Sequence, residues 1–164
     1  MPKGIGWTGR WGIRPVVQRV EGGYRINLGR VERQVVVQCL DEVRALVTDH
    51  DPSTRRLFPT AHVDDPALEA DYRSMVGDDL VQGQIDAIDL VQRTADGATI
   101  DRDGLEAWMR AINSVRLVIG TRLDISEEAI EVEPDDPDLA LYAVYDFLSG
   151  LLGIIVTVLA QDEA

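Results

Sequence analysis

The chain has 164 residues, of which 45% are hydrophobic and 27% are charged, and it contains one cysteine. This length and composition fit one globular domain with a real core, and they exclude a disordered chain. The net charge of −13 argues against nucleic-acid binding by the body of the protein, because phosphate contacts need clustered Lys and Arg.

The charge is unevenly distributed along the chain. Residues 1–34 carry a net charge of +5, and the rest of the chain carries −18. Such an asymmetry favours a basic segment that lies on the acidic surface of its own chain or of a second copy. The alternative is a basic arm for an external acidic partner.

Residues 1–15 are rich in glycine and have no periodicity, which predicts a flexible basic arm. The arm offers four side chains for contact with a protein partner: Trp7, Arg10, Trp11 and Arg14. Residues 16–28 contain two β-prone runs around a glycine pair, which predicts a hairpin. A two-stranded hairpin is only marginally stable alone, so it must pack on helices or on a partner chain.

Apolar residues recur at helical spacing in the rest of the chain. Residues 51–64 predict a short helical turn, and Asp65 is the expected N-cap of the helix that follows it. The expected helices cover residues 31–48, 66–92, 101–123 and about 138–160. The sequence therefore predicts a mainly α domain over residues 16–160, a bundle of three long helices plus shorter ones, with an N-terminal hairpin and a tail at 161–164.

Residues 139–160 are apolar apart from one charge, Asp146. The segment is long enough to cross a bilayer. We expect instead a helix in the centre of the bundle, because a charge inside the span is costly in lipid and both flanks are acidic. A helix that is apolar on all sides is typical of the middle of a bundle.

Arg116 lies among the Val, Leu and Ile residues of the stretch 113–123. At about 100° per residue, it shares one narrow arc with Leu105, Met109, Ile112, Ile119 and Leu123. This spacing predicts that Arg116 is buried, and a buried guanidinium needs an ionised partner.

Asp146 is the first choice of partner for Arg116, and Asp86 and Asp89 are the second choices. We therefore predict a structural ion pair between Arg116 and Asp146 that fixes the register of two core helices. The alternatives are an anion or substrate pocket at Arg116 and a dimer contact.

Other candidate sites are weaker. His50 and His62 each have aspartates nearby, but no recognised metal-ligand spacing is present. Residues 95–106 superficially resemble a calcium loop, although the order of oxygen ligands does not match.

Cys39 shares a helix face with Val36 and Val43, which predicts a buried, unreactive thiol, and a redox role is the alternative. We expect no catalytic residue, no metal and no cofactor.

Three segments carry a family resemblance: residues 53–66, 107–125 and 142–151. With the hairpin and helix before them, they resemble an actinobacterial family long described as a domain of unknown function. One branch of that family is described as an oxidative stress regulator. The resemblance implies a cytoplasmic, non-enzymatic regulator of transcription that acts through a protein partner, a sigma factor of the stress-response type.

The regulator branch senses its signal through a cysteine pair near the N-terminus, and residues 1–15 contain no cysteine. The lone Cys39 also fits a cytoplasmic setting, as does the absence of an apolar run of signal-peptide length at the N-terminus. We expect a partner-binding regulatory module that forms a homodimer and contacts neither nucleic acid nor membrane. The rival hypothesis is a small-molecule-binding protein or enzyme with an anion pocket at Arg116, and DNA binding through residues 3–33 is the least favoured.

Overall fold

A computed structural model of the chain describes residues 10–11, 14–126 and 131–164. It contains four strands and five helices: β1 (Arg10–Trp11), β2 (Arg14–Pro15), β3 (Val17–Val20), β4 (Gly23–Ile26), α1 (Arg30–Thr48), the 3-10 helix η1 (Pro52–Leu57), α2 (Pro66–Thr94), α3 (Arg102–Arg122) and α4 (Leu139–Gln161). The predicted mainly α domain with an N-terminal hairpin is confirmed, with four long helices rather than three.

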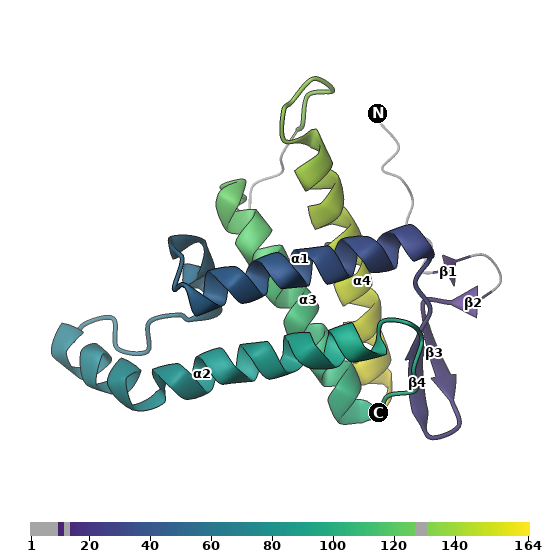
Figure 1. Cartoon of the computed structure of the whole chain (residues 1–164), viewed down its shortest axis with the longest axis horizontal. Helices are drawn as coiled ribbons and strands as arrows, with labels where there is room; N and C mark the ends of the chain where they lie inside the picture. The colour runs from purple at the N-terminus through teal and green to yellow at the C-terminus, as the bar shows by residue number, and fades with distance from the viewer. Residues whose placement is uncertain (1–9, 12–13, 127–130) are drawn as a thin grey trace.

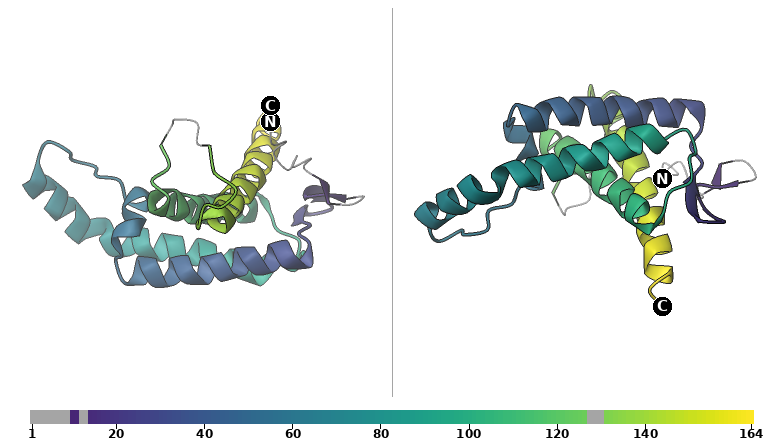
Figure 2. Two further views of the ribbon diagram at one scale, coloured as in Figure 1. Left: turned by 90° about the horizontal axis from the view of Figure 1, so that it is seen from above. Right: turned by 60° about the horizontal axis from the view of Figure 1, so that its bottom comes forward.

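The four long helices form two crossed layers. α1 and α2 run side by side in one layer, and α3 and α4 cross behind them at a steep angle (Figure 1, Figure 2). α3 is the central helix, because it contacts α1, α2, α4, η1 and β4. Its buried residues spread over more than half of its circumference, from Leu105 and Trp108 to Ala111 and Ser114.

Two aspartates define the starts of α2 and α3. The carboxylate of Asp65 accepts a hydrogen bond from the backbone N–H of Leu68 at 3.0 Å, and that of Asp101 accepts one from Gly104 at 2.8 Å. These bonds satisfy N–H groups that have no partner inside the helix. The predicted N-cap Asp65 is thereby confirmed.

The hairpin of β3 and β4 lies against the loop between α2 and α3 and against the C-terminal end of α4. The N–H of Tyr24 donates to the carbonyl of Ile100 at 2.7 Å, and the N–H of Ile100 donates back at 2.9 Å. The Tyr24 hydroxyl and the Arg19 guanidinium both donate to the carboxylate of Asp162. These contacts hold the pKa of Asp162 below its ordinary value, the Tyr24 hydrogen bond being the first cause and Arg19 the second. The hairpin therefore packs on helices, as its marginal stability requires.

The N-terminal arm contains structure that its sequence did not indicate. β1 and β2 pair antiparallel, with Arg10 opposite Pro15 and Trp11 opposite Arg14. Each strand has only two residues, too few for a periodic pattern. The hairpin turn itself lies where it was predicted, at Glu21 and Gly22 between β3 and β4.

α4 is not the central helix that its composition predicted. Its buried residues lie on one face, against α3: Leu148, Leu151, Ile155 and Leu159. It has a mean hydropathy of 2.0 and is long and apolar enough to cross a membrane, and only 22% of its most apolar window is buried. α3 takes the central place because its many small residues, such as Gly104, Ala107 and Ala111, let other elements pack closely around it.

The N-terminal half of α2 extends beyond the other helices (Figure 1). All fully buried residues of α2 lie in its C-terminal part: Ala87, Ile88 and Val91. The projecting half packs on the segment before it, where His62 contacts the Tyr72 ring edge-on and Arg73 donates to the carbonyl of Phe58. Met75 on its outer side is 81% exposed.

Candidate anion-binding groove

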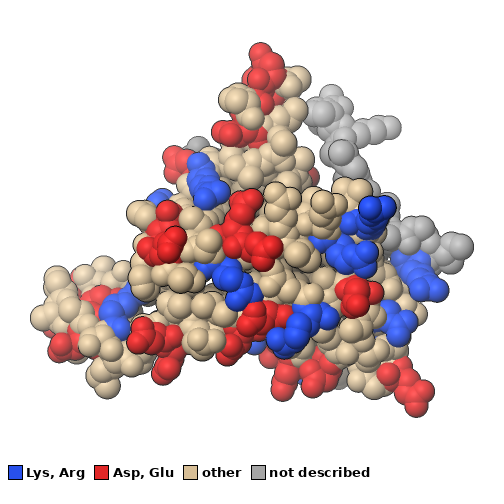
Figure 3. Space-filling view, viewed as in Figure 1, with Lys and Arg blue, Asp and Glu red and all other residues tan. Residues whose placement is uncertain are grey.

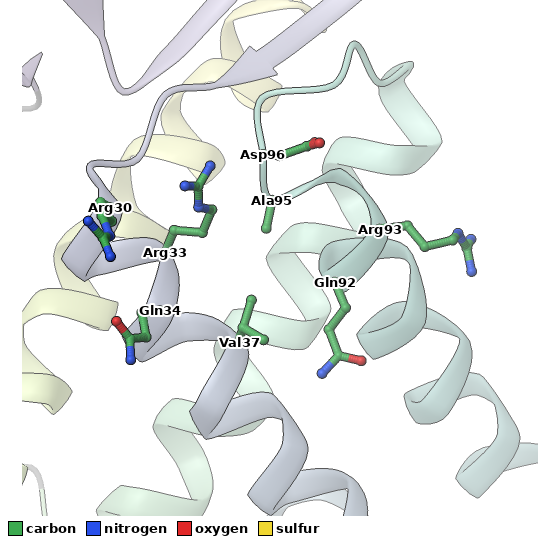
Figure 4. A pocket seen from close by; sticks show the side chains of 8 residues that line it. All are labelled: Arg30, Arg33, Gln34, Val37, Gln92, Arg93, Ala95 and Asp96. Atoms are coloured by element: carbon green, nitrogen blue, oxygen red, sulfur yellow. The ribbon is translucent and has the colours of Figure 1, made fainter.

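A hollow of about 380 Å³ opens between the first turns of α1 and the C-terminal end of α2. Figure 4 shows Arg30 and Arg33 on the α1 side, with Arg33 extending toward the loop that follows α2, whereas Arg93 turns outward. The residues that line the hollow are Arg30, Arg33, Gln34, Val37, Gln92, Arg93, Ala95 and Asp96.

A second hollow of about 270 Å³ continues the first toward β2. Both hollows are lined by Ala95 and Asp96, so they are neighbours, and together they are called the arginine groove from here on. The other residues that line the second hollow are Arg14, Ile26, Asn27, Leu28, Gly29 and Gly97. The lining therefore combines aliphatic side chains with guanidinium and amide groups.

A polar network holds the two helices of the groove together. Arg44 of α1 forms an ion pair with Asp89 of α2 and donates to Oε1 of Gln92 at 2.9 Å. The amide nitrogen of Gln92 donates to Asp41 at 2.7 Å. At the opposite end, the pair of backbone hydrogen bonds between Tyr24 and Ile100 fixes the loop after α2. The groove therefore has rigid walls.

The groove is positively charged in an acidic protein. In the described part of the chain, none of its arginines has a carboxylate within 4.0 Å. Asp96 is the one acid that lines the groove. In Figure 3, Lys and Arg gather at the right-hand end of the molecule, where α1 begins, and acids cover the loop before α4 at the top.

The start of α1 adds to this positive potential. No side chain caps the first N–H groups of α1 at Gly29, so these groups and the positive end of the helix dipole add positive potential beside Gly29, which lines the second hollow. The carboxylate of Glu32 in the first turn offsets part of this potential.

The groove can bind an anionic group. Guanidinium groups bind carboxylates and phosphates through paired hydrogen bonds. Among the described residues that line the two hollows there is no Ser, Thr, Cys, His, Tyr or Lys, and Asp96 supplies the one carboxylate.

The predicted ion pair between Arg116 and Asp146 is wrong. The Arg116 guanidinium donates to the Tyr145 hydroxyl at 3.2 Å and to Oδ1 of Asn113 at 3.2 Å, and it lies 5.8 Å from the centre of the Tyr145 ring. Asp146 is exposed. It follows Tyr145 in α4, and one residue turns a side chain by about 100° around the helix, away from α3.

Arg116 is half-buried at the edge of the buried face of α3, whose centre is formed by Trp108, Ala111 and Val115. Its Nε is buried and has no hydrogen-bond partner among the described residues. The two aspartates predicted as alternative partners of Arg116 also have other partners. Asp86 accepts a hydrogen bond from Gln82, and Asp89 forms an ion pair with Arg44. Arg116 lines neither hollow of the groove.

Of the four arm residues proposed for partner contact, Arg14 is exposed and lines the arginine groove. Arg10 and Trp11 form β1, and Trp7 lies outside the described residues. Arg30 and Arg33 were noticed only as part of the basic N-terminal segment. Arg93 was missed, because about sixty positions separate it from them and only the pairing of α1 with α2 brings it near.

Neither histidine belongs to a described cluster of side chains that could bind a metal ion. Within residues 10–11, 14–126 and 131–164, no group of three or more His, Cys, Asp or Glu side chains is placed to hold a metal ion. His62 contacts Tyr72, and His50 follows α1 with a φ of 53° in the turn before η1.

Cys39 is half-buried on α1, and its thiol should react slowly. Burial, and to a smaller extent Glu42, raise its pKa from 9.0 to about 11. Since the thiolate is the reactive form, alkylation at pH 8 should be roughly a hundredfold slower in the native protein than in urea-unfolded protein. The native rate should increase with pH up to about 11. A time course of iodoacetamide labelling by mass spectrometry measures both rates, and equal rates would show an accessible, reactive thiol.

Comparison with known proteins identifies a family but no function. A family model described as a domain of unknown function (DUF2017) matches residues 13–159. No curated protein matches the chain. No solved structure matches it either.

Proposed function

The chain belongs to the family described as domain of unknown function DUF2017, and from that starting point we propose that it is a non-enzymatic module that binds an acidic segment of a protein partner in the arginine groove. The observation that carries this proposal is a cluster of arginines, Arg14, Arg30 and Arg33 among them, that have no carboxylate partner among the described residues of a chain with a net charge of −13.

The shape of the groove favours an extended peptide as its ligand. The two hollows are neighbours and open to solvent, and Val37 and Leu28, which line them, can contact the apolar side chains that accompany acids in a peptide. The polar rim includes amide groups of Gln34 and Asn27, which can bind a peptide backbone. Duplex DNA is a poorer ligand, because the acidic body of the protein repels a long polyanion.

The biological role proposed here is regulation in the cytoplasm. The resemblance to oxidative stress regulators favours a sigma factor as the protein partner, and the groove supplies a surface for such contact. The second candidate function, an anion or substrate site at Arg116, is favoured by one observation: its buried Nε has no partner in the described part of the chain.

Binding of a labelled acidic peptide, measured by fluorescence anisotropy, tests the groove. The probe is a twelve-residue peptide of alternating Glu and Leu. The double variant Arg30→Glu, Arg33→Glu should bind at least about tenfold more weakly, because each charge-assisted contact contributes about 1.5–3 kcal/mol and 1.4 kcal/mol is a factor of ten.

The matched control is Arg55→Glu, Arg110→Glu, which makes the same change of charge at two exposed arginines outside the groove. It should change the affinity by less than about threefold at 0.15 M salt, where distant charges are screened. Equal weakening in both double variants, or no binding by the wild-type protein, would overturn the proposal. Tighter binding of a short DNA duplex than of the peptide would also overturn it.

A further inference from the structure

The outer face of α4 is apolar and uncovered within the described chain. The face that packs on α3 contains Leu148, Leu151 and Ile155, and the opposite face is open to solvent. Leu139 and Val156 are 45% and 44% exposed. A helix of mean hydropathy 2.0 with this much exposed surface points to a second contact that a single copy of the chain does not make.

The outer face has an unusual order of residues. Exposed or half-exposed residues recur along it at alternating spacings of three and four: Ala143, Asp146, Gly150, Gly153, Thr157 and Ala160. This is the spacing of a helix–helix seam. When the order is read from both ends, Ala143 corresponds to Ala160, Asp146 to Thr157, and Gly150 to Gly153. The face is therefore complementary to itself when two copies run in opposite directions.

We infer that α4 joins two copies of this chain into a dimer, with the two α4 helices packed antiparallel about a two-fold axis between Leu151 and Leu152. In this arrangement Gly150 of each copy lies against Gly153 of the other, which lets the helix axes approach closely. Asp146 of each copy faces Thr157 of the other, whose hydroxyl now donates to the carbonyl of Gly153 in its own helix. That hydroxyl can turn to donate to the carboxylate, so the charge on the seam has a partner.

The charges around α4 favour a second copy of the chain, rather than a lipid bilayer, as the partner of its outer face. Acids lie at both ends of the helix, with Asp136 and Asp138 before it and Asp162 and Glu163 after it, and Asp146 lies on the outer face in the N-terminal half of the helix. A lipid environment would take up the Asp146 charge at a high cost, and the acidic ends are repelled by anionic headgroups.

The charges also select the antiparallel orientation. Arg19 and Arg102 lie at the C-terminal end of α4, where they bind Asp162 and Glu163, and both arginines remain partly exposed. Antiparallel packing brings the acidic N-terminal end of one α4 to an end of the other whose acids are paired with arginines, whereas parallel packing would place the two acidic loops together.

Gly153 leaves room for a close neighbour on the outer face. A Cβ on this residue would have no atom of the described residues within 4 Å, as is also true at Gly77 and Gly83 of α2, so none of these residues requires glycine there. Glycine in the middle of a helix is less stable than alanine, and it is expected where another backbone approaches closely.

Sedimentation equilibrium at micromolar concentration tests the inference. Wild-type protein should sediment as a dimer of the 18.1 kDa chain, and Gly153→Leu should shift it to the monomer with unchanged circular dichroism. The control is Gly77→Leu on α2, a second helical glycine whose Cβ would have open space around it, and this variant should remain dimeric. A wild-type monomer, or a Gly153→Leu variant that stays fully dimeric, would overturn the inference.

Cross-linking tests the orientation in a Cys39→Ser background. Mixed and oxidised Asp146→Cys and Thr157→Cys chains should give a disulfide-linked heterodimer, and neither chain alone should give a cross-linked homodimer in comparable yield. Efficient cross-linking of Asp146→Cys alone would show a parallel arrangement and overturn the antiparallel one. Cosedimentation with phosphatidylcholine vesicles tests the alternative that lipid covers the outer face. Wild-type protein that binds the vesicles as a monomer would show that α4 contacts lipid and would overturn the inference.

Discussion

Trp108→Ala should lower the free energy of unfolding by about 3–5 kcal/mol, the usual range for removing a fully buried aromatic side chain. Trp108 is 0% exposed and lies in the middle of α3, the helix that every other long helix contacts. Its removal leaves a cavity that rigid neighbours fill only in part. Urea unfolding followed by circular dichroism at 222 nm measures the loss, and a loss below 1 kcal/mol would show that α3 is not the centre of the core.

Trp108→Phe separates the volume of the ring from its hydrogen bond. The indole N–H of Trp108 donates to the Thr94 hydroxyl at 2.9 Å, and this hydroxyl itself donates to the carbonyl of Leu90 at 2.7 Å. Phenylalanine keeps most of the packing and leaves Thr94 with the Leu90 bond. We therefore expect a loss of about 1–2 kcal/mol for this variant, well below that of alanine.

The order of elements was predictable because its signals are local. Helical periodicity and the N-cap Asp65 located the long helices to within a few residues, and the glycine pair located the hairpin turn. These features act between residues a few positions apart, so a single sequence contains them.

The burial of α3 and α4 was not predictable from their composition. The apolar arc drawn through Arg116 was too narrow, because α3 is buried around more than half of its circumference and Arg116 lies at the edge of that face. α4 is the more apolar helix, yet it lies at the side of the bundle. Average hydropathy does not distinguish a helix that is covered by its own chain from one that is covered by another molecule.

The candidate groove was predictable only in part. The excess of +5 in residues 1–34 pointed to Arg14, Arg30 and Arg33. Asp96 and Arg93 come from the far end of α2, and their position depends on how α1 and α2 pack. No local pattern in the sequence reports such a contact.

Gly23→Ala should destabilise the protein by about 3 kcal/mol or more, because it combines backbone strain with the loss of two hydrogen bonds. Gly23 has a φ of 146°, and a Cβ there would lie 2.0 Å from the carbonyl oxygen of Ile100. To relieve this overlap, β4 must move away from Ile100, which breaks both backbone hydrogen bonds between Tyr24 and Ile100.

Gly22→Ala is the matched control for this substitution. Gly22 also has a positive φ, of 85°, but a Cβ there would have no atom within 4 Å, so only the conformational cost of about 1–2 kcal/mol remains.

Hydrogen exchange at the Ile100 amide should accelerate strongly in Gly23→Ala and little in Gly22→Ala. Because the loop that ends at Ile100 begins with Ala95 and Asp96 in the wall of the arginine groove, Gly23→Ala should also weaken binding of the acidic peptide. Equal losses of stability in the two variants would show that the contact with Ile100 contributes nothing, and that the groove wall is held by the helices alone.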